Sequence, residues 1–225
     1  MTDADLKLYG YWRSMAAYRV RVALNVKGIS AREIAVDLDA GEQLSAEFLA
    51  VNPEGAVPAL VVSGHPPLVQ SNAILEFIEE QYPDPPLLPK DAYGRARVRS
   101  LVALVVSDTH PLIVPRVQRY LATKASFDST ALGKWQIHWI RHGLTTIEKR
   151  LASDDATGSF CHGDRVTLAD ICLASLATVV RMFKFDITDA PTVMRIVDRC
   201  ETLDAFARAH PMRQLGAPKP VPEPS

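Results

Sequence analysis

The sequence contains few cysteines, and they are not spaced for redox or metal chemistry. Its three cysteines, Cys161, Cys172 and Cys200, lie far apart, and no Cys-x-x-Cys pair occurs. An odd number of widely spaced cysteines argues against a disulfide framework and is typical of small buried side chains in a reducing compartment. Of the six histidines, His138 and His142 are four apart, but no carboxylate or third ligand accompanies them. We therefore expect no metal site.

Neither an excess of one charge nor a long apolar stretch is present. The 25 basic and 26 acidic residues leave a net charge of −1, so no strong overall field attracts nucleic acid or anionic lipid. The longest uninterrupted apolar run, 101–106, has six residues, whereas a membrane-spanning helix needs about 20. The N-terminal residues carry acid rather than base, unlike a signal peptide. From these absences we expect a cytoplasmic protein without membrane or nucleic-acid partners.

The 225 residues, 48% of them hydrophobic, suffice for one large or two small domains. Over the first 82 residues, short β-like runs alternate with helices. Runs 6–9 and 33–36 predict strands on either side of a helix that Ser14 opens and Gly28 ends. Runs 59–62 and 67–69 predict a hairpin, followed by a helix that Ser71 caps. A βαβ crossover joins parallel strands and a hairpin joins antiparallel ones, so we expect a mixed sheet.

A proline-rich segment separates this pattern from a purely helical one. The four prolines of the segment 82–89 cannot continue a helix. Beyond them the periodicity predicts helices over 95–121, bent at Pro111 and Pro115, and over 135–151, 167–182, 192–200 and 203–209. We therefore expect an α/β domain over 1–82, a linker over 83–90, an all-α domain over 91–215 and a disordered proline-rich tail over 216–225.

Ser14 stands where a helix would begin directly after the first strand. A helix N-terminus there exposes free N–H groups and the positive end of the helix dipole, which favour an anion such as a thiolate. A redox version of this architecture would carry Cys-x-x-Cys, whereas the sequence reads RSMAA (13–17). A serine hydroxyl cannot exchange disulfides, but it can donate a hydrogen bond to a ligand's thiolate. The plainer interpretation, which this position alone favours, is an N-cap worth about 1 kcal/mol.

Two further positions place binding groups at the ends of predicted strands. Val57-Pro58 opens the third strand, where proline is tolerated. A cis bond would leave the N–H and C=O of Val57 free to pair with an extended peptide, although trans is the default geometry. Gln70 and Ser71 precede the next helix. Ser71 is either a helix cap or a partner for a ligand carboxylate, and the two roles can coexist.

Four segments are similar to motifs of the glutathione transferases. YWRSMAAYRVRVALNVKG (11–28) resembles the signature of the zeta class, which includes maleylacetoacetate and maleylpyruvate isomerases. NPEGAVPAL (52–60) and QSNAILEFIEE (70–80) resemble motifs that mark only the superfamily. GDRVTLAD (163–170) resembles its helix-capping motif, in which Thr167 and Asp170 form a Thr-x-x-Asp variant of the capping box. The resemblance extends to about residue 215.

The resemblance implies a fold, a cosubstrate and an assembly. We expect a thioredoxin-like α/β domain with a mixed sheet, an all-α helical-bundle domain, glutathione as cosubstrate and a homodimer. Ser14 matches the residue whose hydroxyl supports the glutathione thiolate, and Arg13 and Arg116 match cations that hold substrate carboxylates. The other matches are to glutathione-binding positions: Gln43 near the glycyl carboxylate, the backbone of Val57, the cis-proline Pro58, the γ-glutamyl residues Gln70 and Ser71, and His110.

Two positions depart from the family pattern. Met15 stands where many zeta members have a second serine, and Met182 stands where the family often has an arginine. Because methionine is neutral, one clamp for a substrate carboxylate is absent unless Lys184 replaces it. Arg181 is one helical position away, about 100° around the axis.

Three functions remain compatible with these residues. The first is an enzyme that isomerises the cis double bond of maleylacetoacetate or maleylpyruvate through transient addition of the glutathione thiolate, without a metal. The second is a general transferase or peroxidase for hydrophobic electrophiles, whose apolar second site Met15 and Met182 would suit. The third is a non-catalytic interaction module, against which the presence of Ser14, Gln70 and Ser71 argues.

Overall fold

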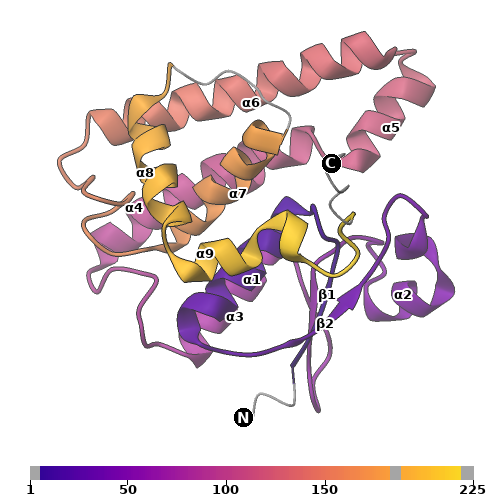
Figure 1. Ribbon diagram of the computed structural model, residues 1–225, viewed down its shortest axis with the longest axis horizontal. Helices are drawn as coiled ribbons and strands as arrows, with labels where there is room; N and C mark the ends of the chain where they lie inside the picture. Colours follow the sequence, from indigo (N-terminus) through magenta and orange to yellow (C-terminus); the bar gives the residue numbers. More distant parts are fainter. Residues whose placement is uncertain (1–5, 183–188, 219–225) are drawn as a thin grey trace, which may run out of the picture. The chain divides into compact units, whose positions relative to one another are not determined.

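The structure is a computed structural model that describes residues 6–182 and 189–218 (Figure 1). The chain forms two compact units. The first, here called the sheet unit, comprises residues 1–85 and 204–225, and the second, the helical unit, comprises residues 86–203. Lys184 and residues 219–225 of the expected disordered tail lie outside the described residues.

Four strands form the sheet in the order β2-β1-β3-β4. β1 (Leu6–Gly10) pairs in parallel with β2 (Arg32–Ala35), whereas β3 (Ala59–Val62) pairs antiparallel with both β1 and β4 (Leu68–Val69). The predicted mixed sheet is therefore confirmed. The registers place Gly10 opposite Ala35, and Ala59 opposite both Tyr9 and Val69. The segments that leave β1, β2 and β4 and the segment that enters β3 consequently lie at one edge of the sheet.

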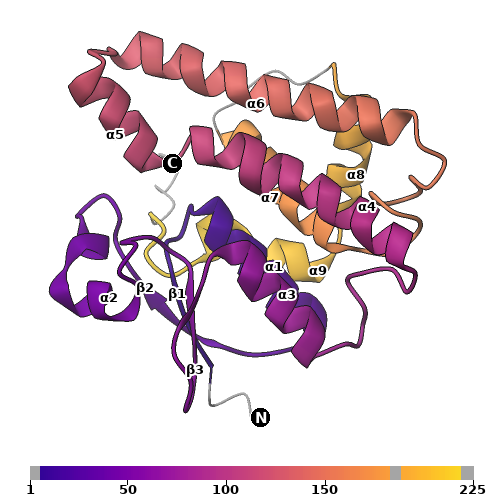
Figure 2. The same cartoon turned by 180° about the vertical axis from the view of Figure 1, so that it is seen from behind.

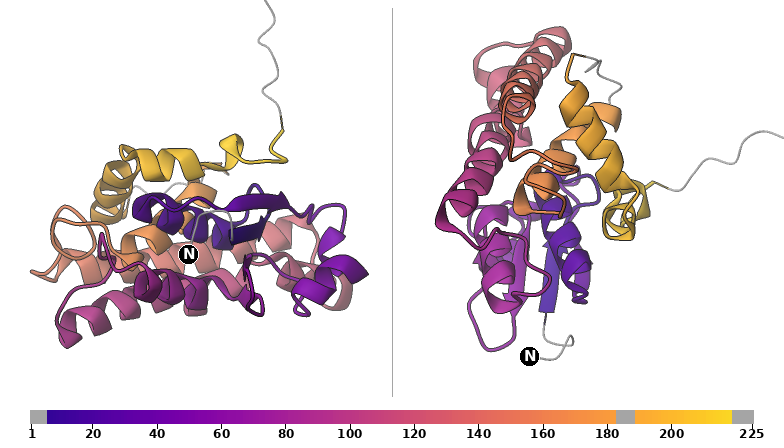
Figure 3. Two further views of the ribbon diagram at one scale, coloured as in Figure 1. Left: turned by 90° about the horizontal axis from the view of Figure 1, so that it is seen from below. Right: turned by 90° about the vertical axis from the view of Figure 1, so that its left-hand side faces the viewer.

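Helix α1 (Met15–Lys27) is the central helix of the sheet unit. It packs against α3 (Ser71–Gln81) and against α9 (Asp204–Ala209), which lies beside it (Figures 1 and 3). Gly28 ends α1 with a φ of 68°, and its N–H bonds the last turn. Shorter elements complete the unit: the 3₁₀ turn η2 (Glu42–Leu44), α2 (Ala46–Val51) and the 3₁₀ turn η5 (Pro211–Arg213).

The expected end of the helical domain differs from the structure. We predicted that residues up to 215 belong to the all-α domain, but α9 packs in the sheet unit. The Asn25 amide donates to the Ala205 carbonyl over 2.8 Å, which fixes α9 near the end of α1. Helical periodicity shows that a segment is a helix but not which apolar surface covers it, so the sequence alone could not assign α9.

The helical unit begins with a stretch that the sequence predicted as one bent helix. It consists of α4 (Ala92–Ala103), the wider π-helical turn η3 (Leu104–Thr109), the 3₁₀ turn η4 (His110–Leu112) and α5 (Pro115–Lys124). Pro111 and Pro115 lack the N–H groups that a continuous helix needs, so the helix breaks there. By length and composition alone, Ala92–Lys124 could cross a membrane. This indication is weak, because the core helices of globular domains pass the same test.

Helix α7 (Leu168–Met182) forms the core of the helical unit and packs against α4 and α8 (Pro191–Glu201), whereas α6 (Ser129–Ala152) packs against α8 (Figure 2). Residues 168–178 are all buried. The buried Asp170 carboxylate accepts hydrogen bonds from the Thr167 N–H over 2.8 Å, the Thr167 hydroxyl over 2.7 Å and the Cys161 N–H over 2.7 Å. This arrangement fixes the start of α7, where the sequence predicted a capping box.

Arg97 of α4 holds the loop that precedes α7. Its guanidinium is almost buried and donates to the Asp154 carboxylate over 2.6 Å, to the Cys161 carbonyl over 2.6 Å and to the Thr157 hydroxyl over 2.9 Å. The hydrogen bond from Arg97 lowers the pKa of Asp154 below its ordinary value. One arginine therefore ties together three points of this loop.

Candidate functional site

Most of the predicted site residues come together at one edge of the sheet. Arg13 and Ser14 follow β1, and Gln43 follows β2. Val57 and Pro58 precede β3, while Gln70 and Ser71 follow β4. Because the strand registers bring these four chain segments to one edge, seven of the nine residues lie on one side of the sheet unit. The other two, His110 and Arg116, belong to the helical unit.

Ser14 is the N-cap of α1. Its Oγ accepts a hydrogen bond from the Ala17 N–H over 3.2 Å, and its own N–H donates to the Tyr11 carbonyl over 3.0 Å. Because Oγ is an acceptor in the cap, the hydroxyl proton can still be donated to a ligand. Of the two interpretations of Ser14, the structure shows the cap, and the cap leaves a role toward a thiolate open.

The Val57-Pro58 peptide bond is cis, as the resemblance implied. Pro58 is buried and Val57 is partly exposed. The paired residues of β3 begin at Ala59, so Val57 lies just outside the sheet ladder. A backbone that is partly exposed and outside the ladder is suited to pair with an extended peptide ligand.

Gln70 has a strained backbone at the start of α3, with φ 68° and ψ 112°. Its side-chain amide donates to the Glu54 carboxylate over 2.6 Å. Non-glycine residues in such conformations cost about 1–3 kcal/mol and cluster at functional sites. The backbone conformation of Gln70 therefore lowers the stability of the fold, which is typical of a residue at a functional site.

The prediction that Ser71 caps α3 is wrong. Gln70 occupies the N-cap position and makes no side-chain capping bond, whereas Ser71 is the first residue of the helix. The Ser71 Oγ instead accepts a hydrogen bond from Nη1 of the buried Arg19 over 3.2 Å. Because Oγ is the acceptor in this bond, the hydroxyl proton is available to another acceptor. This hydroxyl and the uncapped helix N-terminus are both suited to a carboxylate.

Gln43 carries a buried acceptor with no partner. The residue is 9% exposed, and its amide oxygen accepts no hydrogen bond from the described part of the chain. A buried polar atom without a partner costs free energy, so such an atom calls for an explanation. A ligand that offers an amide N–H would satisfy it.

Arg13 forms a cluster with its sequence neighbours and with Asp39, which follows β2. Nη2 of Arg13 donates to both carboxylate oxygens of Asp39, over 2.7 and 2.9 Å. The Tyr11 hydroxyl donates to the same carboxylate over 2.6 Å. The guanidinium also lies 5.5 Å from the ring centroid of Tyr11 and 5.6 Å from that of Trp12. The sequence does not predict a role for Asp39, because an aspartate in a polar loop carries no signal of its own.

The remaining predicted residues lie in the helical unit. His110 begins the 3₁₀ turn η4 and is partly exposed, and Arg116 is exposed in the first turn of α5. Arg181 forms ion pairs with Asp198 and Glu201 of α8. Its neighbour Met182 is partly exposed at the last position of α7. That Arg13 and Arg116 face one ligand stays a prediction.

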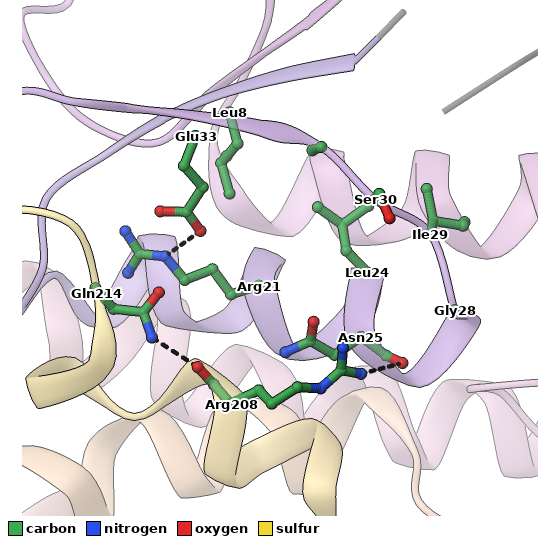
Figure 4. Close-up of a pocket in the computed structure, with 11 residues that line it drawn as sticks. Leu8, Arg21, Leu24, Asn25, Gly28, Ile29, Ser30, Glu33, Arg208 and Gln214 are labelled. Carbon is green, nitrogen blue, oxygen red and sulfur yellow. Dashed lines mark hydrogen bonds and ion pairs between the residues drawn. The ribbon is translucent and has the colours of Figure 1, made fainter. Parts of the chain in front are cut away.

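Away from this edge of the sheet, the described residues include three cysteines and a cavity. The three cysteines are buried, and burial raises the pKa of the Cys161 and Cys200 thiols. A cavity of about 290 Å³ in the sheet unit is lined by residues that include Arg21, Glu33 and Arg208 (Figure 4). Arg21 is paired with Glu33 over 2.7 Å. None of the predicted site residues lines this cavity.

Comparison with known proteins gives the same result for both halves of the chain. The glutathione S-transferase N-terminal domain matches residues 4–80, and the glutathione S-transferase C-terminal domain matches residues 140–204. A maleylpyruvate isomerase from Ralstonia sp. is 43% identical over 209 residues, which cover 93% of this chain and 98% of that protein.

Solved structures show the same similarity in three dimensions. A maleylacetoacetate isomerase from Methylobacterium extorquens AM1, with bound malonate and glutathione, shares 49% identity with a TM-score of 0.93, over 95% of this chain and 100% of that one. A maleylpyruvate isomerase described as a bacterial zeta-class glutathione S-transferase shares 42% identity with a TM-score of 0.91, over 94% and 100% of the two chains. The chain therefore belongs to the glutathione S-transferase family, within its zeta class of maleylacetoacetate and maleylpyruvate isomerases.

Proposed function

We propose that this protein is a glutathione-dependent enzyme that converts a maleyl-type dicarboxylate, maleylacetoacetate or maleylpyruvate, from cis to trans. The observation that carries the proposal is that the segments containing Ser14, Val57 and Ser71 lie at one edge of the sheet in a chain of this family. That edge offers a hydroxyl donor at one helix N-terminus, a partly exposed backbone and a second helix N-terminus.

Glutathione fits the residues present. It is an extended tripeptide with a thiol, two carboxylates and amide N–H groups. The backbone of Val57 would pair with its cysteinyl residue, and Ser71 with Gln70 would hold the γ-glutamyl end. Gln43 has a buried oxygen without a partner among the described residues, which suits an amide N–H near the glycyl end. His110 completes the proposed glutathione-binding residues.

Ser14 has the central part in the mechanism. When bound, glutathione supplies a thiol whose thiolate adds to the cis double bond and leaves after rotation about the resulting single bond. The ordinary pKa of such a thiol is near 8.5, so only a few per cent is ionised at neutral pH. The Ser14 hydroxyl and the first-turn N–H groups of α1 stabilise the anion and so lower that pKa.

Arginines are the proposed partners of the substrate carboxylates. Arg13 is adjacent to Ser14 in the chain, and Arg116 is exposed on α5. A guanidinium matches a carboxylate and can also stabilise the negative charge that develops during the addition. Met182 contributes no charge, so these two residues would carry the recognition.

A general glutathione transferase is the second candidate. Two observations favour it: Met182 is neutral, and Arg13 is already paired with Asp39. The test is to compare the two maleyl substrates with the neutral electrophile 1-chloro-2,4-dinitrobenzene, with and without glutathione. Isomerisation that requires glutathione and exceeds conjugation supports the proposal. Efficient conjugation without isomerisation of either diacid would establish the transferase instead.

The family assignment also leads us to propose a homodimer in the cytoplasm. Light scattering at micromolar protein concentration tests the assembly. A mass of about twice that of one chain supports the dimer, and the mass of one chain contradicts it.

A further inference from the structure

Asp39 is placed against Arg13 by the ends of two neighbouring strands. β1 and β2 are parallel, and Gly10 is opposite Ala35, so the segments after them leave the sheet side by side. The loop after β2 is ordered by its own bonds: the Asp37 carboxylate accepts from the Asp39 N–H over 2.9 Å and from the Ala40 N–H over 3.2 Å. The ion pair therefore follows from the fold.

The Asp39 carboxylate occupies the same guanidinium that a substrate carboxylate would use. Both oxygens of Asp39 accept from Nη2 of Arg13, so one nitrogen of this guanidinium is already bound to a carboxylate. The Tyr11 hydrogen bond also holds the pKa of Asp39 below its ordinary value. The carboxylate is consequently charged at neutral pH, where the substrate would also be charged.

Neither partner depends on the other to stay in place. Arg13 also lies against the rings of Tyr11 and Trp12, which hold a guanidinium through cation–π attraction. Asp39 keeps its hydrogen bond from the Tyr11 hydroxyl when it releases Arg13. The side chains of the pair are 41% and 66% exposed, so water can solvate both after separation. Such pairs contribute little net free energy and exchange easily.

We propose that Asp39 is a specificity-determining residue, an internal carboxylate that competes with the substrate carboxylate for Arg13. This role rests on the proposed function, and through it Asp39 weakens the binding of a dicarboxylate. A ligand carboxylate binds Nη2 of Arg13 at the expense of Asp39, which keeps its hydrogen bond from the Tyr11 hydroxyl. A neutral electrophile needs no displacement, so Asp39 affects only ligands whose carboxylate binds Arg13.

The test is Asp39→Asn, which keeps the shape and removes the charge. We expect the Michaelis constant for the maleyl diacid to fall about two- to five-fold, the range given by exposed ion pairs. The inhibition constant of malonate, measured against conjugation of a neutral electrophile, should fall by the same factor. The constants for that electrophile and for glutathione should not change.

Two controls isolate the competition. Asp204→Asn removes the same charge from an exposed pair with Arg208 in the same unit, and should leave all constants unchanged. In an Arg13→Ala background, Asp39→Asn should have no effect on the inhibition constant of malonate.

Two results overturn the inference. A higher inhibition constant for malonate in Asp39→Asn would show that Asp39 positions Arg13, and an unchanged constant would show that the two carboxylates do not compete. A wild type that conjugates but does not isomerise overturns only the proposed function, because malonate inhibition still measures the competition.

Discussion

The Oγ of Ser14 accepts a hydrogen bond from the Ala17 N–H over 3.2 Å, so the oxygen is bonded within α1 while the hydroxyl proton is available. Ser14→Ala removes both functions. We expect a loss of about 1 kcal/mol in stability from the cap. Loss of a hydrogen bond to a charged group should also raise the pKa of bound glutathione and slow turnover about ten- to a hundred-fold.

Ser14→Asp separates these two effects. An aspartate caps a helix as well as serine does, but its carboxylate cannot donate to a thiolate. The stability of Ser14→Asp should therefore equal that of the wild type. Ultraviolet titration should still show the bound thiol ionising at higher pH than in the wild type. If the titration in Ser14→Ala matches the wild type, Ser14 is only a helix cap.

The backbone of Gln70 links stability with binding. Its φ of 68° favours glycine, so Gln70→Gly should raise the free energy of unfolding by about 1 kcal/mol. The same change removes the amide that we place at the γ-glutamyl group, so the Michaelis constant for glutathione should rise. Gln70→Ala keeps the strain and loses the amide. Gln70→Ala should raise the Michaelis constant for glutathione without raising the free energy of unfolding. A higher free energy of unfolding in both variants would rule out backbone strain as the cause.

The pair of Arg97 and Asp154 predicts a pH dependence of stability. Because the hydrogen bond from Arg97 lowers the folded-state pKa of Asp154, its stabilisation is fully present above the ordinary aspartate pKa near 3.9. It is lost as the pH falls through the lower folded-state value. Asp154 is 37% exposed, so Asp154→Asn should cost only about 1 kcal/mol at pH 7.

Urea unfolding at several pH values measures this effect. The difference between the wild type and Asp154→Asn should shrink below about pH 4. Asparagine can still accept the Ala156 N–H, so the turn itself is retained. A difference that is equal at pH 7 and pH 3 would mean that the charge of Asp154 is not its cause.

The sequence predicted the elements better than it predicted the partners of side chains. Strand and helix periods are local signals, and the mixed sheet that the βαβ and hairpin patterns predicted is present. The bond from Arg19 to Ser71 joins residues 52 apart in the chain. The pair of Arg13 and Asp39 likewise depends on the fold, because parallel strands bring two separate loops together. Neither loop contains a sequence pattern that predicts such a contact. For the same reason the sequence does not predict that α9 packs in the sheet unit.

In the proposed reaction glutathione acts catalytically and is not consumed. The most direct measurement follows a maleyl dicarboxylate by proton NMR with a small amount of glutathione, while total free thiol is titrated in the same sample. We predict complete conversion to the trans isomer with the thiol content unchanged. Loss of one thiol for each molecule of diacid consumed, with no trans product, would contradict the isomerase and show that the protein conjugates its substrate.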